Sequence, residues 1–520
     1  HTWGAHNSVS QPDREFVTRQ WEIKESYATH ANLNARNLLA RGFNRLCQQI
    51  NVEGDTVLAF NWQNYARTEP LEVEINSGQH LVDLSSGKPV PMDVILEKDN
   101  WKRVRFLADN VPAFGYKGFA IRSLSPADTQ KNEKAGGGTI ESKHYRLTVD
   151  AATGGLKSLF DKTEKRELVD STAPYKLNQY LYVSGGENSQ ILNFTFGTAP
   201  AKLTVDTPAG AEIVENLKTP FGQRLIVETK AKNTPAVRSE YLVYDAVKRV
   251  DIVNTVVKQE TRAKEAVYFA FPFAAQKPAF EYQIQNGWCR PNEDQMPGAC
   301  REWFTPQNLV HLRDGAFDVA WSTPDAPLVC LTDINRGQWP AHLPINNGHV
   351  YSYVMHNYWF TNYRAEQGGT FKFRYSLTSG RGLDRVALAR FDADTRAPVL
   401  AYPFVSTFSA AVAKAGRPLS AASGSFLGLE ASNLQMVVLK EAEDGDGFIL
   451  RFREIAGRAG EAELQLPTLR LKEAWLCNGV EVNQRKLPAT VNTVKVPYKA
   501  NQFVTVRLKG EGALRQVAKH

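Results

Sequence analysis

The first hydrophobic pattern in the chain predicts one long helix. Apolar residues recur at approximately helical spacing from Phe16 to Ile50. Ser10 is a candidate amino-terminal cap, because Pro12 and Asp13 follow it at positions that suit the first helical turn. The pattern therefore predicts a helix that ends near Ile50 and is roughly 50 Å long at about 1.5 Å per residue.

The apolar residues of this predicted helix fall on more than one of its faces. They include Phe16, Ile23, Tyr27, Leu38 and Leu39. A helix that is apolar on several faces needs other helices packed around it. Nothing later in the chain predicts a partner of equal length, so we expect this helix to belong to a bundle whose other members lie upstream.

From Val52 onward the pattern changes to short alternating or apolar runs separated by Gly, Pro, Asn and Asp. Runs such as VLAFNWQNY, LEVEI and WKRVRFLA predict β-strands. The strands follow one another without the regular alternation with helices that marks a parallel sheet, so packed antiparallel sheets are expected. One short further helix is predicted around Arg381 to Arg390.

Changes in composition along the chain predict several domains, as its 520 residues also suggest. The expected fold class is mainly β. The expected segments are a remnant of a helical bundle with a loop at 1–50, a small β domain at 51–125, a glycine-rich linker at 126–138, a large β domain at 139–380 and a carboxy-terminal β domain at 381–520.

Composition and charge narrow the classes of partner. The chain is 42% hydrophobic and 22% charged, which is ordinary for a globular protein. Its net charge of +7 arises from 62 basic and 55 acidic residues, and no basic run is interleaved with aromatics, so we expect no nucleic-acid partner. No stretch approaches the roughly 18 apolar residues of a membrane span, so we expect no membrane role either.

The five cysteines are Cys47, Cys289, Cys300, Cys330 and Cys477. Their number is odd, and they lack the close pairs of a zinc site or the density of a disulfide scaffold. We expect buried thiols. Whether Cys289 and Cys300 close a small loop is left open.

The chain opens with HTWGAHNSVS, which puts histidines at positions 1 and 6. Three explanations are open: a cleaved signal peptide that exposes a functional His1, a piece taken from a longer protein, or a loop in which the histidines have no special role. An exposed amino-terminal histidine can hold copper in oxidative polysaccharide-cleaving enzymes, but such a site needs a compact β core directly after it. The helix predicted here favours the second explanation.

Four later stretches resemble the carboxy-terminal half of glycoside hydrolase family 38, the α-mannosidases, in a divergent bacterial branch. They are KHYRLTVDAATGGLKSLFDKTEKRELVD, GWCRPNEDQMPGACREWF, HNYWFTNYRAEQGGTFKFRYSL and VVLKEAEDGDGFILRFREIAGRAG, which begin at Lys143, Gly287, His356 and Val437. The resemblance implies a long helix from a truncated three-helix bundle, a galactose-mutarotase-like antiparallel β supersandwich at 139–380 and a carboxy-terminal β-sandwich.

The resemblance also implies a metal site. The family has a His-Asp-x-x-x-Gly-Thr loop whose histidine binds the catalytic zinc, and by this resemblance His1 is the metal ligand. Thr2 stands where the family has aspartate, which leaves the sugar specificity open. Family members are retaining hydrolases of α-mannosidic bonds. The nucleophile is expected upstream, so we expect no catalytic residue in this chain, one Zn²⁺ shared with a missing amino-terminal domain, and no activity of the chain alone.

Six residues are candidates for contacts with an oligosaccharide or glycan substrate. They are Tyr358, Trp359, Asn362, Arg364, Asp294 and Arg301. Aromatic rings stack on sugars, and Arg and Asn bond their hydroxyls, although aromatics in β domains are more often part of the core. The alternative function is a carbohydrate-binding β protein without catalysis. A homo-oligomer is compatible with the sequence, which does not distinguish bacterial cytoplasm from periplasm.

Overall fold

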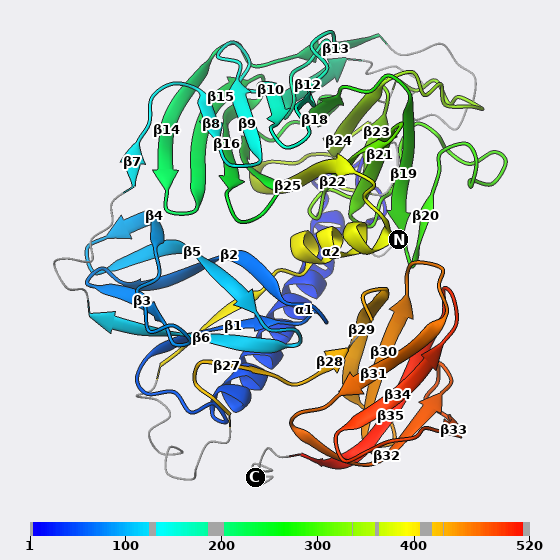
Figure 1. Cartoon of the computed structure of the whole chain (residues 1–520). Helices are drawn as coiled ribbons and strands as arrows, with labels where there is room; N and C mark the ends of the chain where they lie inside the picture. The colour runs from blue at the N-terminus through cyan, green and yellow to red at the C-terminus, as the bar shows by residue number, and fades with distance from the viewer. Residues whose placement is uncertain are drawn as a thin grey trace. The chain divides into compact units, whose positions relative to one another are not determined.

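The computed structural model describes residues 4–123, 132–185, 202–334, 336–358, 363–405, 419–429 and 431–512. Internal contacts divide the chain into two units, the first His1–Arg36 with Asn132–Gly382 and the second Asn37–Lys131 with Leu383–His520. Antiparallel strands dominate both units (Figure 1), which confirms the expected mainly-β fold. No helix in the described ranges is long and apolar enough to span a membrane.

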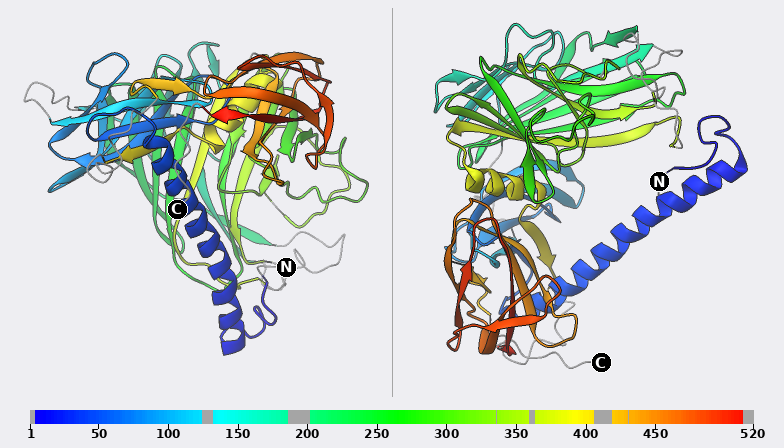
Figure 2. Two further views of the ribbon diagram at one scale, coloured as in Figure 1. Left: turned by 90° about the horizontal axis from the view of Figure 1, so that it is seen from below. Right: turned by 90° about the vertical axis from the view of Figure 1, so that its right-hand side faces the viewer.

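Helix α1 (Glu15–Cys47) is one continuous rod (Figure 2). It begins five residues after Ser10, so the predicted cap was wrong. The residues before it form turns instead, with Asn7 at a φ of 62° and its carbonyl oxygen 2.8 Å from the amide nitrogen of Gln11. The hydroxyl of Ser8 donates a hydrogen bond to the carbonyl oxygen of Tyr363, far along the chain. Contacts with distant residues therefore hold the turns that precede the helix.

Large apolar side chains are exposed along most of α1. They are Phe16, Ile23, Tyr27, Leu33, Leu38 and Leu39, with exposed fractions from 44% to 66%. The helix buries Val17 near its start, and near its carboxyl end it buries Phe43 and Cys47, which join the core of unit 2. Burial also raises the pKa of the Cys47 thiol to about 12.

The large β domain lies in unit 1 and is built on a sheet of ten strands. Their order is β20 (Gly287–Cys289), β19 (Pro278–Ile284), β21 (Leu309–Asp314), β22 (Phe317–Ser322), β25 (Gly369–Arg381), β17 (Val250–Lys258), β16 (Thr234–Tyr244), β15 (Gly222–Ala231), β14 (Ala211–Thr219) and β7 (Glu133–Lys134).

Two smaller sheets complete this domain. The first has the order β13 (Leu203–Asp206), β12 (Gln179–Gly185), β18 (Glu265–Phe273), β24 (Gly348–His356) and β23 (Val329–Leu331). The second has the order β11 (Arg166–Glu167), β10 (Leu156–Asp161), β9 (Tyr145–Val149) and β8 (Thr139–Glu141). The family motif that begins at Lys143 therefore forms the β9–β10 hairpin and its continuation.

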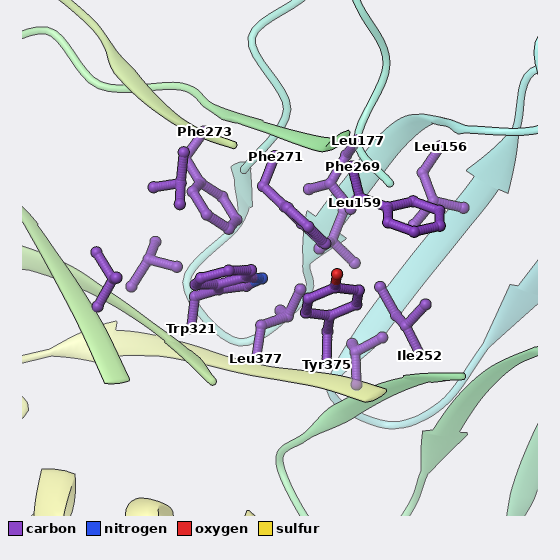
Figure 3. Packing of buried hydrophobic residues seen from close by; sticks show 14 of the residues in the cluster. Leu156, Leu159, Leu177, Ile252, Phe269, Phe271, Phe273, Trp321, Tyr375 and Leu377 are labelled. Atoms are coloured by element: carbon purple, nitrogen blue, oxygen red, sulfur yellow. The ribbon is translucent and has the colours of Figure 1, made fainter. Parts of the chain in front are cut away.

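Strand β18 explains why the sheets stack. Every one of its residues is buried. Phe269, Phe271 and Phe273 face the large core cluster, and Phe271 packs 4.8 Å from Trp321 and 4.9 Å from Tyr375, measured between ring centroids (Figure 3). Because side chains alternate along a strand, Ala266, Tyr268 and Ala270 of β18 belong to a second cluster on the other face. This arrangement confirms the expected β supersandwich.

Unit 2 begins with the small β domain. One sheet has the order β26 (Leu400–Phe404), β1 (Thr56–Asn61), β6 (Gly115–Ser123) and β27 (Ser423–Ser425), with β3 (Gln79–Asp83) also paired to β6. The other has the order β2 (Arg67–Asn76), β5 (Trp101–Val111) and β4 (Met92–Lys98).

Strands β26 and β27 come from the range expected for the carboxy-terminal domain, but they pair with strands of the small β domain. The second helix, α2 (Arg385–Arg396), also lies later than predicted. It starts where the carboxylate of Asp384 accepts a hydrogen bond from the amide of Ala387. This side-chain cap fixes the first turn.

The carboxy-terminal β-sandwich has two sheets. One has the order β28 (Gly428–Leu429), β31 (Gly460–Gln465) and β34 (Thr493–Tyr498). The other has the order β29 (Leu434–Glu441), β30 (Phe448–Glu454), β35 (Phe503–Gly512), β32 (Leu469–Cys477) and β33 (Asn483–Lys486). Apolar residues of both sheets form one cluster between them. This confirms the expected terminal sandwich.

Candidate functional site

The amino-terminal loop before α1 is held on the large β domain within unit 1. The hydroxyl of Ser8 donates a 2.8 Å hydrogen bond to the carbonyl oxygen of Tyr363. The guanidinium of Arg262 donates to both carboxylate oxygens of Asp13, at 2.8 and 2.6 Å, and also bonds the carboxylate of Glu366. These contacts place the loop beside residues 363–366. We call the two segments together with Arg262 the loop junction.

One guanidinium in the loop junction bonds two carboxylates. Hydrogen bonds from Arg262 lower the pKa of Asp13, and the same guanidinium lowers the pKa of Glu366. Both carboxylates therefore stay ionised at neutral pH. A planar guanidinium that bonds two carboxylates also fixes their orientation, because its donors point in set directions.

Asn357 anchors the loop junction to the sheet beneath it. This side chain is buried, and its amide nitrogen donates to the carbonyl oxygens of Ala263 and Ala365, at 2.8 and 3.1 Å. Its side-chain oxygen accepts from the amide of Glu265, at 2.7 Å. One amide thus ties the start of β18 to the segment that holds Ser8 and Asp13.

A buried ion pair lies at the start of β18, next to the residues that Asn357 connects. The ammonium of Lys258 lies 2.8 Å from one carboxylate oxygen of Glu265, and the hydroxyl of Tyr182 donates to the other, at 2.6 Å. The amide of Asn233 in turn donates to the hydroxyl of Tyr182, at 2.8 Å. A buried ion pair with its hydrogen bonds satisfied in this way holds its strands in one geometry.

His356 is the last residue of β24 and pairs with Ala266 near the start of β18. Its ring is 4.9 Å from that of Tyr353 and 5.7 Å from that of Tyr363, centroid to centroid. Burial lowers its pKa to about 4, and the positive charge of Lys264 acts in the same direction. The imidazole is therefore neutral over the physiological range.

The structure describes only part of the predicted sugar-contacting loop. Tyr358 is 6% exposed, and its hydroxyl donates to the carbonyl oxygen of Gly185, at 2.9 Å. Arg364 is an exposed cation 3.8 Å from Glu260. His1, Trp359 and Asn362 lie outside the described residues. Tyr358 thus has the position of a core aromatic, and Arg364 is open to solvent.

The other two predicted residues lie in the loop between β20 and β21, and they do not share a partner. Asp294 accepts hydrogen bonds from the backbone amide, Nε and Nη2 of Arg290, at 2.8, 3.0 and 2.9 Å, and these bonds lower its pKa. Arg301 is 8% exposed and lines a cavity of about 570 Å³. Asp294 is therefore engaged locally, whereas Arg301 faces open space.

The cavity brings together residues that sequence reasoning missed. Besides Arg301, its lining includes Tyr175, Glu302, Arg336 and Tyr351. They come from separate chain segments, and Tyr175 precedes the others by more than 100 residues, so no local pattern identifies them as a set. The motif that begins at Gly287 is the one signal in the sequence that pointed to part of this cavity.

The described part of the chain contains no disulfide and no group of side chains arranged to bind a metal ion. All five cysteines are free, and all except Cys300, which is half-buried, are buried. Cys289 and Cys300 form no disulfide. Within the described ranges no group of three His, Cys, Asp or Glu side chains is arranged to hold a metal ion.

Two models of protein families match the chain in the order of its β domains. The model "Glycosyl hydrolases family 38 C-terminal domain" matches residues 140–321, and "Glycosyl hydrolases family 38 C-terminal beta sandwich domain" matches residues 433–506. The chain carries the carboxy-terminal domains of glycosyl hydrolase family 38. The family 38 resemblance of the sequence is thereby confirmed.

Two solved structures share the fold of this chain. An alpha-mannosidase from Enterococcus faecalis V583 aligns with a TM-score of 0.69 and 14% identity over 95% of this chain and 61% of its own. A family 38 glycosyl hydrolase from Enterococcus faecalis aligns with a TM-score of 0.70 and 13% identity over 97% of this chain and 64% of its own. The chain thus spans less than two thirds of each. No curated protein matches its sequence.

Proposed function

We propose that this chain is the carboxy-terminal part of a retaining, zinc-dependent α-mannosidase that hydrolyses α-mannosidic bonds in oligosaccharides. The two family 38 domains in their family order support the assignment. The observation that carries it furthest is the loop junction, because it holds the loop that follows His1 against the β domain. In this proposal the chain supplies one metal ligand and a wall of the substrate cleft.

The zinc part of the proposal requires groups from outside this chain. The described residues do not form a metal site by themselves. His1 is the ligand that the family resemblance implies, and the remaining ligands are assigned to an amino-terminal domain. When bound, zinc would orient and polarise adjacent sugar hydroxyls.

The hydrolytic chemistry is likewise assigned to that domain. A retaining glycosidase needs two carboxyl groups about 5–5.5 Å apart, one as nucleophile and one as acid and then base. The role of this chain is positional. Arg262 fixes Asp13 and Glu366, and Ser8 fixes the backbone at Tyr363, so the histidine loop is held in one place during the reaction.

Helix α1 offers a surface on which the amino-terminal domain can pack. Its exposed apolar side chains are too many and too large for a helix that faces only water. In the proposal, helices of that domain cover Phe16, Ile23, Tyr27 and Leu38, which completes the bundle predicted from the sequence.

The test uses the protein that contains this chain together with the upstream domain. We expect Arg262→Met to lower kcat/KM for an aryl α-mannoside by at least roughly tenfold, which corresponds to about 1.4 kcal/mol. The matched control is Arg238→Met, which removes an exposed arginine paired with Glu228 in the same domain. Equal activity of both variants would contradict the positional role.

The alternative is a carbohydrate-binding β protein without catalysis. It predicts sugar binding but no release of mannose by the protein with its upstream domain. Anomer-resolved NMR of the product distinguishes the two functions, because the proposal requires the α-anomer to form first.

A further inference from the structure

The cavity of about 570 Å³ in the large β domain has the size of a ligand site. Small-molecule pockets in proteins have volumes of about 300–1,000 Å³. Tyr351 on β24 lines it, as does His349 near the beginning of that strand. His356, beside the loop junction, is seven residues after His349, which is about 23 Å along a strand. The cavity and the loop junction therefore lie near opposite ends of β24.

In the described structure Arg301 has more hydrogen-bond donors than partners, which favours a bound ligand in this cavity. A guanidinium has five N–H donors, and burying a charge without partners is unfavourable. In the described structure Arg301 donates one hydrogen bond, from Nη1 to the carbonyl oxygen of Ala299 at 3.0 Å, and its Nε is buried without a partner. No carboxylate of the described residues lies within ion-pair distance of it. Donors at the cavity wall are therefore left for a bound molecule.

The cavity lining carries equal numbers of positive and negative side chains. Arg301 and Arg336 contribute two positive charges, and Glu302 and Asp333 contribute two negative charges. Arg336 lies 3.7 Å from Asp333. A lining with equal numbers of cations and anions favours a neutral ligand with many hydroxyl groups over an anion, because hydroxyls accept from guanidinium groups and donate to carboxylates.

One aromatic ring is available at the lining. Tyr175 is half-buried, and its ring meets that of the buried Tyr351 edge to face with centroids 6.3 Å apart, so Tyr351 holds the Tyr175 ring in place. The carboxylate of Glu302 accepts hydrogen bonds from the backbone amides of Arg336 and Trp339, at 3.3 and 2.6 Å, and thereby fixes the loop that carries Arg336. Nε2 of His349 is 2.9 Å from the carboxylate of Asp170. The wall is therefore organised before a ligand arrives.

We propose that this cavity binds a neutral saccharide, with Arg301 as hydrogen-bond donor, Asp333 as acceptor and the Tyr175 ring as apolar surface. The site consists entirely of residues of unit 1. The inference concerns binding alone and does not rest on the proposed hydrolysis, so loss of mannosidase activity leaves it untouched.

Isothermal titration of the full chain with α-linked mannobiose and with maltose tests the proposal. At least one of these neutral disaccharides should bind, with about one site per chain. Arg301→Met should weaken that binding at least roughly tenfold, the loss expected when a buried hydrogen bond to a ligand is removed. Asn346→Ala, which removes an exposed amide at the cavity wall, should weaken it severalfold.

The control variant is Arg146→Met, which removes an exposed arginine that lies over the Phe160 ring, outside the cavity lining. It should bind the disaccharide as the unchanged protein does. If Arg301→Met does not fold, Asn346→Ala decides. The proposal is overturned if neither disaccharide binds, if the bound disaccharide is held equally by the cavity variants and the control, or if inorganic phosphate binds in the cavity and the disaccharides do not.

Discussion

At the scale of single residues, the lowered pKa of His356 makes the free energy of unfolding depend on pH. Its pKa of about 4 in the folded protein lies below the ordinary value of 6.5, chiefly because the ring is buried. Below about pH 6.5 the unfolded chain takes up a proton at this position that the folded chain does not. The free energy of unfolding therefore falls as the pH drops from about 6.5 to about 4, by about 3 kcal/mol in total.

Denaturant unfolding of the unchanged protein and of His356→Phe checks this expectation. Between pH 7 and pH 5 the difference between their free energies of unfolding should change by about 2 kcal/mol, because only the unchanged protein loses the contribution of the neutral imidazole. A difference that stays constant over this range would contradict the assignment.

Two lysines near Tyr182 give a second test at this scale. Lys258 and Lys232 each lie 5.7 Å from the centroid of the Tyr182 ring, but only Lys258 is buried and paired with Glu265. We expect Lys258→Met to lower the free energy of unfolding by about 3–5 kcal/mol, because it leaves a buried carboxylate without its cation. Lys232→Met should change it by less than about 0.5 kcal/mol. Equal effects of the two substitutions on the free energy of unfolding, measured with denaturant, would contradict the stabilising role of the buried pair.

At the scale of elements, the turn between β9 and β10 depends on Gly154. Its φ is 76°, and a Cβ atom there would lie 2.4 Å from Cγ2 of Thr229 on β15. Gly154→Ala should therefore destabilise the fold by about 1–3 kcal/mol through backbone strain and overpacking. Gly136→Ala is the control, since a Cβ at that position meets nothing within 4 Å. Thermal unfolding of the two variants compares them, and similar midpoints would contradict the role of the turn.

Local patterns predicted which elements exist, but not where distant contacts set their limits. The helical spacing from Phe16 onward predicted α1, and the short alternating and apolar runs predicted that most of the chain would be β-strands. Ser10 was wrongly expected to cap α1, because Ser8 and Asp13 bond to residues some 250 or more positions away. Strands β26 and β27 were placed with their neighbours in sequence, because strand pairing across hundreds of residues leaves no local signal.

At the scale of the whole molecule, the candidate site was predictable only where a family motif covers it. Arg301 and Arg364 lie in such motifs. Arg262 and Tyr175 lie outside them and acquire their roles through folding, which brings Arg262 to Asp13 and Tyr175 to the cavity. The sequence thus indicates the family, and the structure adds the contacts that hold the amino-terminal loop.

In the proposed function, His1 of this chain is a ligand in the zinc site of a family 38 hydrolase. The most direct measurement is the zinc content of the protein with its upstream domain, taken alongside hydrolysis of an aryl α-mannoside, for the unchanged sequence and for His1→Ala. We predict about one zinc per molecule with activity for the unchanged protein, and loss of both in the variant. An active His1→Ala protein that retains its zinc would rule out His1 as a ligand.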